Sequence, residues 1–167
     1  MLAIILLFVG IASRLIDHSP NFTPIISLAL FSGIYLPRKH ALWLPLALMI
    51  LSDLVIGFHD TIIYTWGSVV LITWIGMKVR DNKSLASILT SNLAGAVLFF
   101  IITNLGAWPT LYPMTWQGLT DCFVMAIPFF RNTFYSTILY SVIFFGAYEF
   151  IAVRVKRTRW ASALLSV

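Results

Sequence analysis

The sequence predicts an all-α, polytopic membrane protein with six transmembrane helices, and composition and charge pattern both indicate this class. Of the 167 residues, 60% are hydrophobic and only 10% are charged, whereas about a quarter of an ordinary soluble domain is charged. The mean hydropathy is +0.93. The charged residues gather in short breaks between long apolar runs, which is typical of segments that cross lipid and are joined by loops in water.

The apolar runs predict the spans of a single integral membrane domain over 1–167. We expect these spans at about 1–13, 24–36, 41–58, 61–77, 84–106 and 128–153. Pro24 suits the first turn of a helix, and Pro37 ends one. The first run lacks the basic residues that precede the apolar part of a signal peptide, so we interpret it as an uncleaved first helix.

Two connections on the predicted outer side differ greatly in length. Residues 59–60 are expected to form a very short turn between the third and fourth spans. Residues 107–127 are rich in aromatic residues, proline and glycine, and we expect them to form an amphipathic outer loop. The last apolar stretch, residues 119–153, overlaps the end of this loop and is longer than the roughly 20 residues of one crossing. The part before Pro128 is therefore expected to be a short interfacial helix or a kinked extension of the last span.

Three basic clusters predict the orientation of the chain. They lie at 38–39, 78–83 and 154–159, and they hold nine of the eleven basic residues. Because cytoplasmic loops carry an excess of lysine and arginine, we expect both termini in the cytoplasm and the loops at 14–23, 59–60 and 107–127 outside. The formal charge of +5 then reflects membrane topology. It does not indicate nucleic acid as a partner, because no basic face lies on a soluble element.

Polar residues inside the spans indicate where function is concentrated, since each is costly in lipid unless it is paired or faces a cavity. Asp53, Arg131 and Asn104 fall in the outer half of their spans, and a buried Asp53–Arg131 ion pair would satisfy both charges. Such a pair is either a structural link between helices or part of the floor of an outward-facing pocket. Polar residues recur along one face of the last span; of these, Asn132 and Tyr140 are expected on the pocket wall.

Other chemistries are less well supported by the residue patterns. His18, His59 and Cys122 come from three different loops without metal-ligand spacing, so we predict no metal site and no cofactor. Cys122 is expected to be a small buried residue, although a ligand role for it stays open. No phosphate-binding loop or nucleophile elbow is present, and the chain is not expected to be an enzyme. Ala29 and Gly33 form a small-xxx-small pattern that permits close helix approach.

Several sequence blocks resemble those of an uncharacterised bacterial family grouped with membrane transport proteins. The blocks are PNFTP at 20–24, SLALFSG at 27–33, LSDLVIGFH at 51–59, TNLGAW at 103–108 and AIPFFRNT at 126–133. That family is similar in size and topology to the S components of energy-coupling factor transporters, which bind vitamins and related micronutrients. The resemblance implies a multi-pass protein of the bacterial inner membrane that binds a small-molecule substrate.

The resemblance also implies a pocket and a partner. The pocket would open to the outside beneath the loops after the first, third and fifth spans. A membrane coupling subunit with ATP-binding-cassette ATPases would dock on Ala29 and Gly33. Two other classes stay open: a structural or assembly subunit of a larger membrane complex, and a membrane-embedded enzyme acting on lipid. The loop residues expected to bind a flat heterocycle are Asn21, His59, Trp108, Tyr112 and Trp116.

Overall fold

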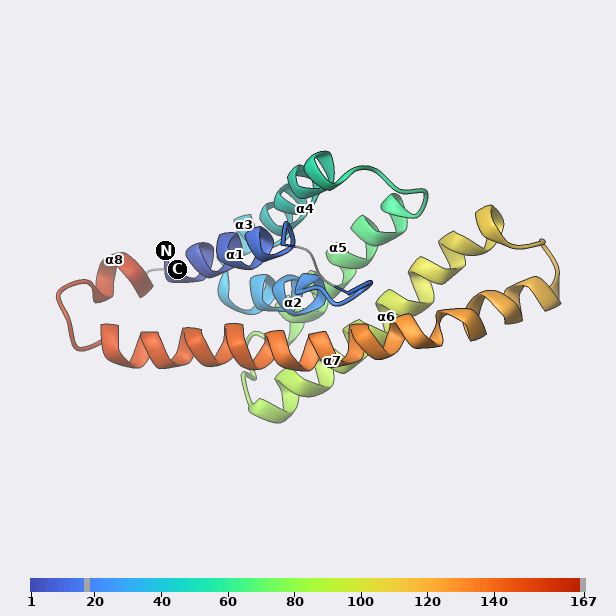
Figure 1. Ribbon diagram of the computed structural model, residues 1–167. Helices are drawn as coiled ribbons and strands as arrows, with labels where there is room; N and C mark the ends of the chain where they lie inside the picture. Colours follow the sequence, from blue (N-terminus) through green and yellow to red (C-terminus); the bar gives the residue numbers. More distant parts are fainter. Residues whose placement is uncertain (17–18, 166–167) are drawn as a thin grey trace.

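The computed structural model describes residues 1–16 and 19–165, and all of their regular structure is helical (Figure 1). The all-α class is confirmed. The helices are α1 (Leu2–Ser13), α2 (Ile25–Tyr35), α3 (Arg38–Ala41), α4 (Trp43–Ile56), α5 (Ile62–Val79), α6 (Leu85–Leu111), α7 (Trp116–Val155) and α8 (Ala161–Leu165). Within the described residues, four segments are long and apolar enough to cross a membrane, namely Arg38–Ile56, α5, α6 and α7. Several long apolar helices of this kind are typical of a multi-pass membrane protein.

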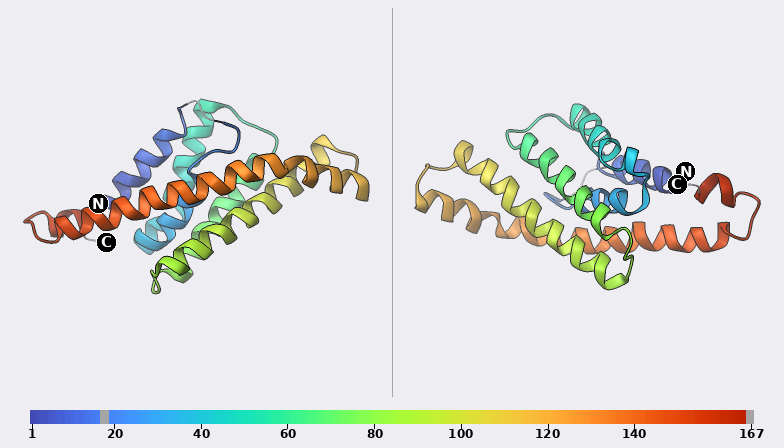
Figure 2. Two further views of the ribbon diagram at one scale, coloured as in Figure 1. Left: turned by 60° about the horizontal axis from the view of Figure 1, so that its bottom comes forward. Right: turned by 180° about the vertical axis from the view of Figure 1, so that it is seen from behind.

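Helix α2 forms the centre of the bundle. Every one of its residues is buried, and it packs against α1, α5, α6 and α7. The views in Figures 1 and 2 agree in placing it inside the other helices. Because neighbouring helices cover its apolar surface, α2 does not need to be long enough to face lipid along the full thickness of a bilayer.

The closest helix contact in the fold joins α2 to α5. A Cβ atom added at Gly33 would lie 2.2 Å from the Thr73 carbonyl oxygen and 2.8 Å from the Gly76 Cα. Only glycine permits this approach of two backbones. The expectation that Ala29 and Gly33 form a docking face for a partner is wrong, because both residues are buried inside the chain.

Helices α6 and α7 form a hairpin that extends further than the sequence predicts. The expected outer loop at 107–127 is helical at both ends, and only residues 112–115 connect the two helices. Thr115 caps α7, since its hydroxyl accepts a hydrogen bond of 3.1 Å from the Gly118 amide. Pro109 and Pro128 are accommodated within the helices. In both figures the tip of this hairpin projects past the other helices.

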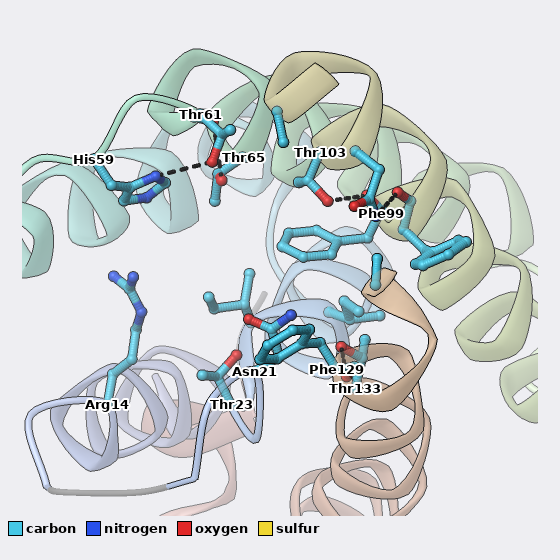
Figure 3. Close-up of a pocket in the computed structure, with 16 residues that line it drawn as sticks. Arg14, Asn21, Thr23, His59, Thr61, Thr65, Phe99, Thr103, Phe129 and Thr133 are labelled. Carbon is cyan, nitrogen blue, oxygen red and sulfur yellow. Dashed lines mark hydrogen bonds between the residues drawn. The ribbon is translucent and has the colours of Figure 1, made fainter. Parts of the chain in front are cut away.

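The connection between α4 and α5 is also longer than expected. It covers 57–61 rather than 59–60, because Gly57 ends α4 with a φ of 109°. This is a left-handed conformation that glycine adopts without strain. The connection carries His59 and, directly before α5, its N-cap residue Thr61 (Figure 3).

Direct contacts bring the basic clusters to one end of the molecule. Arg80 donates hydrogen bonds to the carbonyl oxygens of Gly33 and Leu36 at the end of α2. The Lys83 ammonium lies 4.8 Å from the centre of the Tyr35 ring, and the Tyr35 hydroxyl donates to Glu149 Oε1 at 2.6 Å. Glu149 precedes the basic C-terminal cluster by one to two helical turns. The Met1 ammonium donates a hydrogen bond of 3.1 Å to the Leu164 carbonyl oxygen, so the start of α1 contacts α8.

Candidate ligand-binding cavity

A cavity of about 330 Å³ lies at the end of the bundle opposite the basic clusters. Its volume is within the range of roughly 300–1,000 Å³ that is usual for ligand pockets. Residues from the end of α1, the following loop, the 57–61 connection, α5, α6 and α7 surround it (Figure 3). The lining residues are Arg14, Asn21, Thr23, Ile25, Ile26, His59, Thr61, Thr65, Phe99, Phe100, Thr103, Asn104, Ala107, Ala126, Phe129 and Thr133.

Arg14 is the charged residue of this lining, and it forms a buried ion pair. Its side chain is only 9% exposed, and its Nη1 donates to Asp53 Oδ1 at 2.7 Å and to the Ser52 hydroxyl. Trp66 Nε1 donates to the other carboxylate oxygen of Asp53 at 2.8 Å. Asp53 therefore has a counter-ion and a hydrogen bond on each oxygen, which is what a carboxylate that is 1% exposed requires.

The predicted ion pair between Asp53 and Arg131 is wrong. Helix α4, which carries Asp53, packs against α1 and α5, so the carboxylate meets Arg14 and Trp66. Arg131 is exposed on α7 and does not line the cavity. In the sequence, Arg14 follows directly after an apolar run, which predicts an aqueous loop at this position. Arg14 stands alone at the predicted outer end of a span, away from the three basic clusters. This isolated position was the sequence feature that could have indicated a buried partner for Asp53.

The hydroxyl groups of the cavity mostly offer acceptor oxygens. The hydroxyls of Thr65, Thr103 and Thr133 each donate to a backbone carbonyl four residues earlier, at 3.2, 2.8 and 3.1 Å. Their protons are therefore used, and their lone pairs stay available. Asn104 likewise uses one amide proton on the Phe100 carbonyl at 2.7 Å. A bound molecule could donate hydrogen bonds to these groups.

The cavity has a polar side and an aromatic side. Figure 3 places Arg14 and His59 on one side and Phe99 and Phe129 on the other, with Asn21 between them. His59 is exposed, and its Nδ1 lies 3.0 Å from the Thr61 hydroxyl, which holds the ring at the rim. Such an arrangement suits a small molecule with one polar end and one flat apolar part.

The other predicted site residues fall into two groups. Asn21, His59 and Asn104 line the cavity. Asn132 and Tyr140 lie outside the lining: Asn132 Nδ2 donates to the Pro20 carbonyl at 3.0 Å and so holds the loop that carries Asn21, while Tyr140 stacks on Phe144.

The aromatic residues expected at the mouth of the pocket lie in the α6–α7 hairpin. Trp108 Nε1 donates to the Pro113 carbonyl at 2.9 Å and closes the turn. Tyr112 follows the last residue of α6, and Trp116 is 86% exposed at the start of α7. None of the three lines the cavity. The helical extension of α6 and α7 moved these side chains away from the cavity rim.

Cys122 is a buried thiol of the α6–α7 contact, and its Sγ lies 3.4 Å from the Asn104 carbonyl oxygen. Within residues 1–16 and 19–165, no three histidine, cysteine, aspartate or glutamate side chains form a group that could hold a metal ion. His18, which the sequence analysis considered together with His59 and Cys122, lies outside the described residues.

Comparison with known proteins assigns the chain to a family. Neither the curated proteins nor the solved structures include a significant match. One family model, described as "Family of unknown function (DUF6580)", matches residues 1–160. Because the match covers nearly the whole sequence, the chain belongs to this family of unknown function.

Proposed function

We propose that this chain is the substrate-binding membrane subunit of an importer for a small molecule, similar to an S component. The observation that carries the proposal is the cavity of about 330 Å³, which has a buried arginine on one side and phenylalanine rings on the other, with threonine hydroxyls such as Thr103 and Thr133 beside the rings (Figure 3). A few well-placed polar groups within an apolar pocket are typical of sites for small organic ligands.

The proposal includes six membrane spans with both termini in the cytoplasm of a bacterium. Helices α1 and α2 have 12 and 11 residues and are each only about 17 Å long, so they would cross as short helices within the protein. The clustering of basic residues at one end supports this orientation. The cavity at the other end would then open to the outside of the inner membrane.

Transport would require a partner. The sequence contains no phosphate-binding loop, so energy would come from a membrane coupling subunit with ATP-binding-cassette ATPases. Since Ala29 and Gly33 are buried, that subunit would have to dock on another surface of the bundle.

Native mass spectrometry of the chain extracted in a mild detergent tests the proposal. We expect a stoichiometric small molecule bound to the protein, and we expect Asn104→Ala to reduce its occupancy, because Asn104 lines the cavity. Asn82→Ala is the matched control, since Asn82 is exposed near the opposite end. A folded, monodisperse protein that carries no small molecule, and releases none on denaturation, would contradict the proposal.

One observation favours the alternative of a structural or assembly subunit. Arg131 is exposed on the apolar helix α7, and its side chain has no hydrogen bond or ion pair within the described part of the chain. A cation at such a position is costly in lipid unless a headgroup or another protein satisfies it. If gentle extraction recovers the chain with other proteins in fixed ratio and without a small molecule, the assembly role is favoured instead.

A further inference from the structure

We propose that the molecule bound in the cavity carries a carboxylate, and that Arg14, which lines the cavity, binds this group through the guanidinium N–H groups that Ser52 and Asp53 leave free. The inference rests on the proposed function and assigns the chemical class of the ligand. The two members of the Arg14–Asp53 pair differ in their hydrogen bonding. Both carboxylate oxygens of Asp53 accept hydrogen bonds, whereas Arg14 retains N–H donors without a partner.

The carboxylate of Asp53 is fully engaged. One oxygen accepts from Arg14 and the other from Trp66, and the side chain is removed from the cavity lining. Asp53 therefore holds Arg14 in position, and it is not itself available to a ligand.

The guanidinium of Arg14 is only partly engaged. It has five N–H donors, of which the Nη1 group serves Ser52 and Asp53. The Nε atom is buried and has no hydrogen-bond partner among the described residues. A buried donor without an acceptor is unfavourable, and the Nε–Nη2 edge forms a planar fork that matches the two oxygens of a carboxylate.

The electrostatics of the lining agree with a single negative charge on the ligand. Among the described residues that line the cavity, Arg14 alone carries a permanent charge, and none is an aspartate or a glutamate. His59 stands at the rim and can also donate a hydrogen bond. One fork, already half neutralised by Asp53, suits a monoanion better than the two charges of a phosphate ester.

The remainder of the cavity defines the rest of the ligand. The rings of Phe99 and Phe129 lie across from Arg14 (Figure 3) and would contact a flat apolar body. The oxygens of Thr103 and Thr133, whose protons serve their own helices, would accept hydrogen bonds from N–H or O–H groups. The predicted ligand is thus a small aromatic or heteroaromatic acid with hydrogen-bond donors.

The compound released from the wild-type protein is the first probe. We expect carbodiimide-activated coupling to methylamine to convert one carboxyl group of this compound to its methylamide, so that its mass changes by the addition of one methylamine and the loss of one water. We expect that methylamide to bind the emptied protein at least tenfold more weakly than the unmodified compound, as measured by calorimetry. A released compound without a carboxyl group, or one that binds equally well as its methylamide, would overturn the inference while leaving the proposed function intact. Recovery of no compound at all would count against the proposed function instead, and the inference would fall with it.

The variant Arg14→Lys tests the residue. Lysine retains the charge opposite Asp53 but lacks the planar fork, so we expect at least a tenfold loss of occupancy in a protein that still elutes as a single species. Arg131→Lys is the control, because this arginine is exposed on α7 and should not affect binding. Undiminished occupancy in Arg14→Lys would refute the role of Arg14. If that variant does not fold, the chemical identity of the wild-type compound still decides.

Discussion

At the residue scale, a local network of four side chains pairs the two buried charges and satisfies the Asp53 carboxylate. Arg14 contacts Ser52 and Asp53, and Trp66 completes the hydrogen bonds of the carboxylate. These residues come from α1, α4 and α5, so a single network joins three helices near the cavity. Because each charge is more than nine-tenths buried, removal of either one leaves the other without compensation.

The variant Asp53→Ala should destabilise the folded protein strongly. Loss of one partner from a buried ion pair costs about 3–5 kcal/mol, because the guanidinium of Arg14 would stay buried without a counter-ion. The check is the thermal unfolding midpoint in detergent. Asp60→Ala is the control, since Asp60 is exposed in the adjacent connection, and it should leave the midpoint nearly unchanged. Equal midpoints for both variants would show that the network contributes little to stability.

The variant Trp66→Phe isolates the second hydrogen bond of the network. It preserves most of the aromatic volume but removes the donor to Asp53 Oδ2, and a hydrogen bond to a charged group contributes about 1.5–3 kcal/mol. We therefore expect a smaller loss of stability than for Asp53→Ala in the same unfolding assay. Trp116→Phe, at an 86% exposed position, should have no comparable effect; an equal loss there would argue against the specific role of the bond.

At the scale of the elements, the packing of α2 on α5 depends on the absence of side chains. The backbones meet at Gly33 and Gly76, where an added Cβ at Gly76 would lie 2.5 Å from the Leu30 carbonyl oxygen. Backbone atoms cannot move aside as a flexible side chain can. The two helices must separate if either glycine acquires a side chain, and this would disturb α2, whose neighbours surround the cavity.

The variant Gly33→Ala should therefore be destabilising although alanine favours helices. Overpacking of a close contact typically costs about 1–3 kcal/mol. Gly67→Ala in α5 is the matched control, because a Cβ at Gly67 meets nothing within 4 Å; there the better helix propensity should stabilise by up to about 1 kcal/mol. Thermal unfolding of the two variants should shift in opposite directions, and a stabilised Gly33→Ala would contradict the close contact.

At the scale of the whole molecule, the length of α7 sets the depth of the protein in a membrane. The segment from Arg131 to Arg154 is about 35 Å long, close to the hydrocarbon thickness of roughly 30 Å. With these arginines near the two boundaries, the part of α7 before Arg131 would lie with the end of α6 at the outer interface. The exposed Trp116 suits that position, since tryptophan is enriched at headgroup level.

Labelling of single cysteines would test the proposed orientation. In a Cys122→Ala background, Asp60→Cys should react with a membrane-impermeant maleimide in intact cells, because Asp60 is exposed beside the cavity. Asn82→Cys, exposed near the basic end, should react only in inside-out vesicles. The reverse pattern would invert the topology and place the cavity opening in the cytoplasm.

Features of the fold that depend on local sequence patterns agree with the predictions, whereas features that depend on contacts between distant residues do not. Helix class and the approximate positions of α1, α2, α4 and α5 follow from local patterns of apolar, charged and helix-breaking residues. The hairpin was mispredicted because proline and glycine were interpreted as loop signals. In the structure, Pro109 and Pro128 lie within helices, and Gly118 is required where the Pro113 carbonyl oxygen approaches.

The sequence by itself determined that this chain is a helical membrane protein with its basic residues between apolar segments, because hydropathy and charge act on each segment separately. It also indicated that Asp53 must have a cationic partner and that Asn21, His59 and Asn104 lie near one another at one end. Only the tertiary structure decided that Arg14 is that partner. Ion pairing depends on which helices pack side by side, and the packing of α4 on α1 and α5 is a long-range contact that local patterns do not encode.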